Sequence, residues 1–281
     1  MISTDILRQV LTDNRNLVAQ KKVFPRVIEI GELPRCVLVG VRRSGKSYLL
    51  FSKIQSLLAS GHSWDKVLYV NFEDERLMGF DVADFNKLLE VHAELSGKDS
   101  LPALFLDEIQ LIEGWEKFAR RMADAQAEIY ITGSNAKMLS IQIAAALGGR
   151  FLTVNVFPLN FSEYLKAKGV AVRKDVWSST TGKARILREF AEFFEYGGLP
   201  ECVQFSNKLE YINSVFQKIY LGDIIVRNKV TNALPLRILL KKVAESIGQP
   251  VSFTRLTNVI QSTGVKLAKN TCIRYMQYAC E

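Results

Sequence analysis

The sequence predicts an α/β fold: a parallel β-sheet covered by helices, followed by a helical region and a small basic domain. Three observations lead to this prediction. Short apolar runs alternate with helical stretches as far as residue 158, no further strand-like run is evident between residues 160 and 252, and positive charge gathers near the C-terminus. Alternation of strands and helices is typical of a parallel sheet, because each strand needs a crossover to reach the next.

The elements of the first part follow in order along the chain. A helix is expected first, because apolar residues recur at helical spacing from Ile6 to Val18 and the pattern ends before Pro25. The predicted strands are Cys36–Val39, Val67–Val70, Ala103–Leu106, Ile129–Ile131 and Phe151–Val156. The predicted helices between them are Ser47–Ala59, Val82–Leu95, Trp115–Ala125 and Ala136–Leu147.

The rest of the chain shows helical patterns only. These are Phe161–Lys168, Lys183–Tyr196, Leu209–Leu221, Leu234–Ile247, Thr254–Ile260 and Lys269–Tyr278. Residues 227–281 hold nine Lys and Arg against two Glu, a net charge of +7, whereas residues 1–226 hold a net charge of only +1. The predicted domains are therefore 1–158, a helical connector 159–230 and a basic domain 231–281.

Composition excludes several classes of protein. Apolar residues make up 48% and charged residues 23%, which is ordinary for a globular chain and unlike a disordered or fibrous one. No apolar run approaches the roughly 18 residues of a membrane helix, and the N-terminus lacks a signal-peptide pattern. A cytoplasmic protein without a membrane partner is expected. The four cysteines form no C-x-x-C pair, so a structural zinc site is not expected.

The sharpest motif is the segment Gly40–Ser47, which reads G-V-R-R-S-G-K-S and matches the phosphate loop G-x-x-x-x-G-K-[ST]. It follows a predicted strand and opens a predicted helix, so its backbone N–H groups can point at an anion. Lys46 can reach the β- and γ-phosphates of a nucleotide, and the Ser47 hydroxyl can bind Mg²⁺. The predicted nucleotide contacts are Gly40, Val41, Arg42, Arg43, Ser44, Gly45, Lys46, Ser47 and Tyr48.

A second motif is the apolar strand Leu104–Leu106 that ends in the carboxylates Asp107 and Glu108. Asp107 is expected beside the phosphate loop, where it would hold the Mg²⁺ water shell. Glu108 is expected to polarise the attacking water. The alternative is a solvated acidic turn at a strand end. An acidic pair favours hydrolysis over nucleotide storage, for which one Asp would suffice.

Two weaker candidates follow. Asn135 or Ser134, after the strand Ile129–Ile131, could contact the γ-phosphate or orient the water, with Thr132 a lesser candidate; Ser134 and Asn135 are also preferred caps for the next helix. Arg150, after a pair of glycines, could serve as an arginine finger within the chain or across a subunit interface. The alternative for Arg150 is a solvated surface residue.

Together these motifs resemble a known family. The loop G-x-R-R-x-G-K-S, the strand F-L-D-E-I-Q, the strand end T-G-S-N and the segment A-L-G-G-R with the following F-P-L-N-F-S-E-Y-L look like the AAA+-related ATPases of bacteria and archaea. The segments Gly197–Pro200 and Tyr220–Ile225 look like the branch with a winged helix and a C-terminal domain of unknown function. The resemblance implies a five-stranded parallel core with Walker A and Walker B motifs, a sensor at Ser134 or Asn135 and a finger at Arg150. It also implies ATP rather than GTP.

The winged-helix assignment places a helix-turn-helix in residues 231–281, with Gly264 in the turn. Asn270, Thr271 and Arg274 would then face outward and could contact DNA, whereas the alternative is a lid or a protein-docking module. Members of the family continue well beyond the winged helix, whereas this sequence stops at Glu281 within a predicted helix. The winged helix is therefore expected to be incomplete and the C-terminal domain to be missing.

The function predicted from the sequence is Mg²⁺-dependent ATP binding and hydrolysis, stimulated by a partner. The partner could be DNA, bound through the basic C-terminal region, another protein, or further copies of the same chain. The alternative is a nucleotide-dependent DNA-binding or protein-docking switch with little hydrolysis.

Overall fold

The computed structural model describes residues 2–24, 26–28, 30, 33–98, 100–133, 147–171 and 176–280. The chain divides into two compact units, Met1–Ser206 and Asn207–Glu281. The boundary falls inside the segment 159–230 that was predicted to be a connector. Residues 159–206 of that segment therefore belong to the unit that contains the sheet, and residues 207–230 belong to the unit that contains the C-terminal helices.

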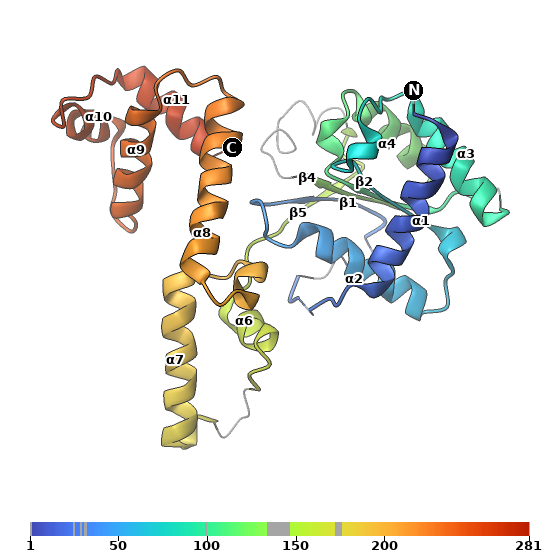
Figure 1. The fold of residues 1–281 in the computed structure, drawn as a ribbon, viewed down its shortest axis with the longest axis horizontal. Coiled ribbons are helices and arrows are strands. Elements are labelled where there is room, and N and C mark those ends of the chain that lie inside the picture. Colours follow the sequence, from blue (N-terminus) through green and yellow to red (C-terminus); the bar gives the residue numbers. More distant parts are fainter. Residues whose placement is uncertain are drawn as a thin grey trace. The chain divides into compact units, whose positions relative to one another are not determined.

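A five-stranded parallel sheet forms the centre of the first unit (Figure 1). Its strands are β1 (Arg35–Val39), β2 (Val67–Asn71), β3 (Ala103–Asp107), β4 (Ile129–Gly133) and β5 (Leu152–Asn155). Their order across the sheet is β2-β3-β4-β1-β5. The predicted α/β class is confirmed, and the five predicted strands differ from the observed ones only at their ends. The order sets β4 between the strand before the phosphate loop and the strand before the acidic pair.

Helices cover both faces of this sheet (Figure 1). One face packs against α1 (Thr4–Gln20), α3 (Asp84–Ser96) and α4 (Trp115–Asp124), and the other packs against α2 (Lys46–Ala59). Successive residues of β1 alternate between the two cores, since Val37 and Val39 join the first and Cys36 and Leu38 the second. Burial on both sides explains why the strands read as continuous apolar runs. Short helical turns lie at Trp64–Lys66 (η1), Glu75–Leu77 (η2) and Ile109–Leu111 (η3).

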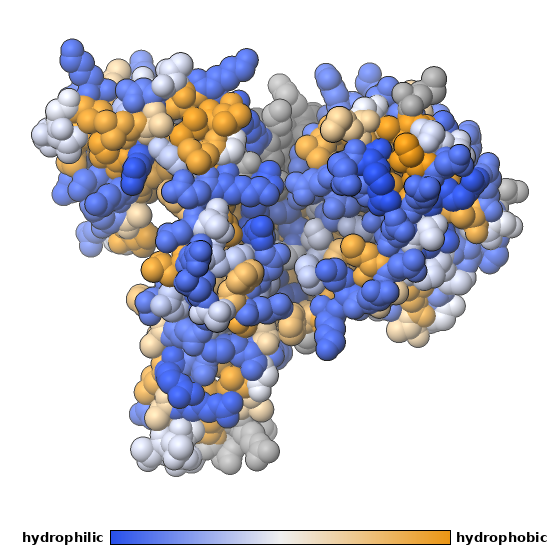
Figure 2. All heavy atoms as spheres, viewed as in Figure 1, coloured by the Kyte–Doolittle hydropathy of each residue, from blue (hydrophilic) through white to orange (hydrophobic). Residues whose placement is uncertain are grey.

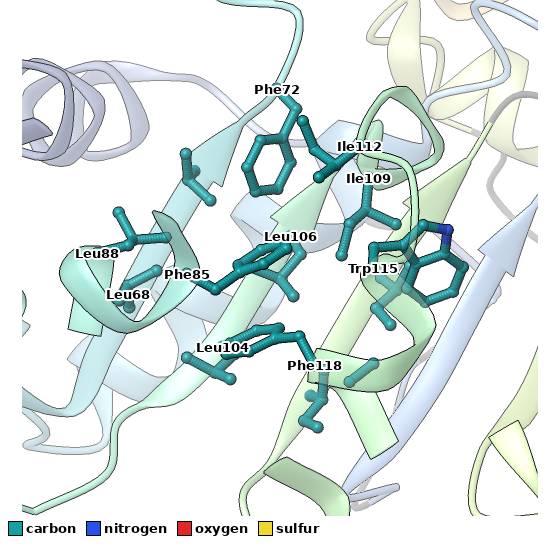
Figure 3. Close-up of a cluster of buried hydrophobic side chains, with 14 of the residues drawn as sticks. Leu68, Phe72, Phe85, Leu88, Leu104, Leu106, Ile109, Ile112, Trp115 and Phe118 are labelled. Atoms are coloured by element: carbon teal, nitrogen blue, oxygen red, sulfur yellow. The ribbon is translucent and has the colours of Figure 1, made fainter. Parts of the chain in front are cut away.

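The core on the α3 and α4 side reaches the loop that carries the acidic pair. Figure 3 shows the rings of Phe85 and Phe118 in this core, and they stack with centroids 4.1 Å apart and planes inclined by 7°. Ile109 and Ile112, which follow the acidic pair, are buried in the same cluster. Packing of these two residues therefore anchors the loop on the apolar core.

Residues 159–206 form a helical part of the first unit with a small core of its own. Its elements are α6 (Phe161–Ala167), η5 (Val176–Ser178), α7 (Thr180–Tyr196) and η6 (Pro200–Gln204). The turn between α7 and η6 needs glycine at Gly198, because a Cβ there would lie 2.0 Å from the Leu159 carbonyl oxygen. The Leu159 N–H donates to the Gly198 carbonyl at 2.7 Å. This contact ties the turn to the chain that leaves β5.

Helices, joined by turns and short irregular segments, are the regular secondary structure in the described residues of the second unit. It contains α8 (Lys208–Gln217), a π-helical segment η7 (Lys218–Val226), α9 (Ala233–Glu245), α10 (Phe253–Gln261) and α11 (Lys269–Cys280). Its core is apolar and is centred on Leu236, Leu239, Ile260 and Cys272. Gly264, with φ of 83°, lies between α10 and α11. The helices predicted here are present, and the assignment of a winged helix stays a prediction.

The surface of the second unit mixes apolar and polar residues, as Figure 2 shows for the face in view. On α11, Asn270 and Arg274 are exposed as predicted, whereas Thr271 is half-buried. Lys266 and Lys269 are exposed as well. In the parts of the chain that are described, no helix is both long and apolar enough to cross a membrane.

Candidate functional site

The loop between β1 and α2 has the backbone of a phosphate loop. At Gly40 a Cβ would lie 2.1 Å from the Val156 carbonyl oxygen, so only glycine lets this loop pass so close to the exit of β5. Gly45, with φ of 97°, precedes the first turn of α2, and Arg43 also adopts a left-handed conformation with φ of 62°. The first glycine therefore provides space and the second provides backbone freedom. The N-terminus of α2 faces the loop, as an anion site requires.

Lys46 lies folded over this loop. Its side chain is buried, and Nζ donates to the carbonyl oxygens of Gly40 and Val41, each at 3.0 Å. Burial lowers the pKa of Lys46, and the charges of Glu108 and Asp107 oppose that shift. The loop thus holds an ammonium group close to two carboxylates, and backbone carbonyls are its hydrogen-bond acceptors.

Ser44 supplies a buried hydroxyl inside the loop. The residue is fully buried, and its Oγ atom has no hydrogen-bond partner among the described residues. Buried polar atoms are nearly always paired in folded proteins, with protein, water or ligand. The Ser44 hydroxyl can therefore pair with a water molecule or with a polar atom of a ligand, but not with an apolar group.

Asp107 ends β3 and collects hydrogen bonds from three other elements. Its carboxylate accepts from the Tyr69 hydroxyl of β2 at 2.9 Å, from the Thr132 hydroxyl of β4 and from Ser47 of α2. Burial raises the pKa of Asp107, while the bonds from Thr132, Ser47 and Tyr69 lower it. The structure thus joins the two predicted metal ligands, Ser47 and Asp107, by a hydrogen bond.

Glu108 is half-buried and adopts a left-handed backbone conformation with φ of 54°. Its backbone N–H donates to Thr132 Oγ1 at 3.0 Å, and its carboxylate accepts a hydrogen bond from Gln110. Such backbone conformations persist in residues other than glycine only where their surroundings hold them. Here the hydrogen bond to Thr132 and the buried Ile109 provide that hold.

Thr132 connects Asp107 and Glu108, although the sequence made it only a lesser candidate. Its buried hydroxyl donates to Asp107 and accepts from the Glu108 backbone, because β4 lies next to β3 in the sheet. The signal for it was a hydroxyl at the carboxyl end of an otherwise apolar strand. Ser134 and Asn135, which the sequence favoured, lie outside the described residues. Tyr69 was missed, because a strand aromatic indicates only core.

The two arginines of the loop point to partners outside it. Arg42 lies with Nη1 3.6 Å from the Glu73 carboxylate. Arg43 forms an ion pair with Glu201 of η6. This second pair connects the phosphate loop with the turn after α7.

The remaining predicted site residues lie at the margin. Val41 is 56% exposed, and the ring of Tyr48 packs against Phe51 with centroids 5.4 Å apart. Arg150 Nε donates to the Asp124 carboxylate at 2.7 Å, and a third of its side chain is exposed. In the single chain, therefore, Arg150 binds α4 rather than the phosphate loop.

Arg26 was missed entirely by sequence reasoning. It donates to the Glu163 carboxylate at 2.9 Å, to the Ser44 carbonyl at 3.0 Å and to the Phe157 carbonyl at 2.8 Å. Only 8% of its side chain is exposed. A lone arginine between the first helix and the first strand carries no motif, and its partners are 18 to 137 residues away in the sequence.

Residues 34–165 match the AAA domain family. This segment is an AAA domain. It contains the phosphate loop, the acidic pair and all five strands, so the sheet and the predicted site both lie within the matched residues. The resemblance to AAA+-related ATPases is thereby confirmed, whereas the C-terminal domain of unknown function remains a prediction.

Two curated relatives match most of the chain in sequence. An uncharacterized protein of Methanocaldococcus jannaschii is 34% identical over 284 residues, covering 99% of this chain and 62% of the relative. An uncharacterized protein of Haemophilus influenzae is 32% identical over 244 residues, covering 85% of this chain and 58% of the relative. The chain thus spans about three fifths of the length of these relatives.

Among solved structures, the Walker-type ATPase of Pyrococcus abyssi covers 99% of this chain and 89% of its own, with 12% identity and a TM-score of 0.46. AMPPCP-bound DnaA from Aquifex aeolicus covers 98% of this chain and 86% of its own, with 14% identity and a TM-score of 0.36.

Proposed function

We propose that the AAA domain binds Mg²⁺-ATP at the loop Gly40–Ser47 and hydrolyses it. One observation carries the proposal: a buried cation, a hydroxyl and two carboxylates lie close together at the carboxyl edge of the sheet. Ser47, Asp107 and Thr132 are linked by hydrogen bonds, Glu108 joins through Thr132, and Lys46 lies within the field of both carboxylates.

The loop fits the phosphates of a nucleotide. The helix N-terminus, the ammonium of Lys46 and the Ser44 hydroxyl, which has no hydrogen-bond partner in the described part of the chain, are all groups that stabilise phosphate oxygens. Lys46 would exchange its two backbone acceptors for the β- and γ-phosphates. Tyr48 and the exposed Val41 would then lie at the rim of the site.

Ser47 and Asp107 suit Mg²⁺, because hydroxyl and carboxylate oxygens are the ligands this ion prefers. Their mutual hydrogen bond brings both to one position. Bound there, Mg²⁺ would neutralise negative charge on the phosphate oxygens. A cation beside Asp107 would also favour the ionised carboxylate, which burial disfavours.

Glu108 is the proposed general base or water-positioning residue. Thr132 fixes its backbone and Gln110 its carboxylate, so the acid is held next to the metal position without being part of it. Asn135 is the proposed sensor of the γ-phosphate. Arg150 is the proposed finger for a neighbouring copy, and its ion pair with Asp124 would have to open for that role.

The proposal is tested by calorimetric titration of Mg²⁺-ATP into wild type and Lys46→Ala. Loss of the one lysine of the phosphate loop should abolish tight binding while the fold, checked by circular dichroism, stays intact. Lys53→Ala is the matched control, since that lysine lies on the same helix but over the Tyr130 ring, at 5.8 Å from its centroid. Unchanged affinity in Lys46→Ala would contradict the assignment of the site.

A second candidate function is a nucleotide-dependent DNA-binding or protein-docking switch with little hydrolysis. The net charge of +7 in residues 227–281 and the exposed Lys266, Lys269 and Arg274 favour it. Turnover of ATP, measured with and without duplex DNA, distinguishes the two functions. Turnover that rises with DNA would support a partner-stimulated ATPase, whereas tight ATP binding without turnover in either condition would support the switch.

A further inference from the structure

We propose that Arg26 is a positioning residue that sets the shape of the phosphate loop from outside the motif. The inference rests on the proposed nucleotide site, because its effect is read through phosphate binding. Arg26 lies on the segment between α1 and β1, and its three guanidinium nitrogens each make a different contact. One of these contacts is with the loop itself.

The contact with the loop goes to a backbone atom whose direction matters. Nη1 of Arg26 donates to the Ser44 carbonyl at 3.0 Å. In a planar trans peptide the C=O and N–H groups point in opposite directions. Holding the Ser44 carbonyl toward Arg26 therefore turns the Gly45 N–H away from it. A phosphate site needs its loop N–H groups turned toward the anion, so the arginine fixes the peptide on which Gly45 depends.

Arg26 also limits the space beside Gly45. A Cβ at Gly45 would lie 3.2 Å from Arg26 Nη1 and 3.5 Å from Pro200 Cγ. A side chain at Gly45 would therefore crowd these two groups, and the left-handed backbone at Gly45 would strain it as well. Nη2 of Arg26 donates to the Phe157 carbonyl at 2.8 Å. The same guanidinium group therefore binds both the phosphate loop and the segment that follows β5.

Glu163 binds the third nitrogen of the Arg26 guanidinium group. Its Oε1 accepts from Arg26 at 2.9 Å and from the Val27 backbone at 2.7 Å. Its Oε2 accepts from the Asn160 backbone at 2.9 Å, as part of a capping box at the start of α6. Burial raises the pKa of Glu163, but these hydrogen bonds outweigh it and keep the pKa below its ordinary value. The acid is thus ionised and fixed in direction, which fixes the guanidinium in turn.

A purely structural ion pair would look different in an experiment. A lysine at position 26 keeps the charge opposite Glu163 but presents a point charge, which cannot serve three acceptors arranged around a planar fork. If Arg26 only balances the charge of the buried Glu163, Arg26→Lys should keep both the fold and the ATP affinity of wild type. If it positions the loop, Arg26→Lys should keep the fold and lose affinity for Mg²⁺-ATP about tenfold or more.

The experiment titrates Mg²⁺-ATP into wild type, Arg26→Lys and Arg76→Lys, with thermal unfolding followed by circular dichroism. Arg76 is the matched control, because its three nitrogens also make three contacts, all with Asp13 and Asp74. We expect similar thermal midpoints for the two variants and weakened ATP binding for Arg26→Lys alone. Wild-type affinity in Arg26→Lys, or an equal loss in Arg76→Lys, would overturn the positioning role.

Two further outcomes keep the test decisive. If Arg26→Lys does not fold, the double variant Arg26→Gln with Glu163→Gln removes the buried charges together, and it should fold yet show the same loss of affinity. Wild-type affinity in that double variant would overturn the inference. Absence of ATP binding in wild type would instead refute the proposed function, so the two failures are distinguishable.

Discussion

The two units of the molecule differ in where they keep their charges. In the first unit several charged side chains are buried, whereas in the described part of the second unit the buried side chains are apolar apart from Thr257. The buried Lys, Asp and Glu residues of the described chain are Lys46, Asp84, Asp107, Glu163 and Glu189. Burying a charge is unfavourable unless it is paired. The difference fits the proposed function, which assigns nucleotide binding and hydrolysis to the first unit, whereas the charged side chains described in the second unit are not buried.

Buried charge alone does not mark a site, as two acids of the first unit show. Asp84 accepts from the backbone N–H groups of Ile2 and Asp81, and Glu189 pairs with Lys168 at 2.6 Å. Both are satisfied by partners that hold chain segments together. Asp107 differs because it lies at the carboxyl edge of the sheet, where ligands of α/β proteins bind, and within the field of Lys46.

The largest expected effect separates the site from the rest of the first unit. Glu108→Gln should lower ATP turnover by about 10²- to 10⁴-fold while ATP binding is kept, because an amide cannot take a proton from water. Steady-state turnover and calorimetric titration measure the two properties. The control is Glu113→Gln, which changes an exposed acid on the same segment between β3 and α4. This variant should behave as wild type. Wild-type turnover in Glu108→Gln would move the catalytic role to another group.

Thr132→Val tests the link between the two acids. The change keeps the shape of the side chain but removes the donor to Asp107 and the acceptor for the Glu108 backbone N–H. Leaving buried polar groups unpaired should reduce the free energy of unfolding by about 1–3 kcal/mol and should lower turnover. Denaturant unfolding and turnover report the two effects. Thr153→Val on the edge strand is the control, since Thr153 is exposed; equal losses in both variants would argue against a special role for Thr132.

Asp107→Asn tests how burial of this carboxylate affects the pH dependence of stability in the ligand-free protein. Since burial raises the pKa of Asp107 above its ordinary 3.8, the folded state keeps this proton to higher pH than the unfolded state. Wild type should therefore lose stability as pH rises from about 3.8 through the folded pKa. The variant lacks this titration, so its stability relative to wild type should rise over that window. Denaturant unfolding at several pH values measures it, and a difference constant with pH would contradict the raised pKa.

How much of this site the sequence could predict depends on distance along the chain. The phosphate loop and the acidic pair are contiguous strings, so their chemistry can be recognised locally. Strand order cannot be read in this way, and it is the place of β4 beside β3 that makes Thr132 a partner of Asp107. Arg26 is further from recognition still, because its carboxylate partner Glu163 lies 137 residues away. Local chemistry was therefore predictable, and the residues that position it were not.

The smallest expected effect concerns the second unit. Its exposed basic residues should bind duplex DNA weakly, with an affinity that falls as salt rises, by a slope of about −0.9 per phosphate contact on a log–log plot. Reversing two charges just before and at the start of α11, in Lys266→Glu with Lys269→Glu, should reduce both the affinity and that slope. Fluorescence anisotropy with a labelled duplex at several salt concentrations measures both.

The control for this prediction comes from the same unit. Lys241→Glu with Lys242→Glu makes the same change of net charge on α9, where both lysines lie within 4.0 Å of Glu245. If the α10–α11 surface binds DNA as a helix-turn-helix does, the first pair should weaken binding more than the second, because contacts concentrate at one face. Equal effects would mean that net charge alone attracts the duplex. Absence of wild-type binding at low salt would contradict the DNA hypothesis and would leave a protein-docking surface as the explanation for the exposed charge.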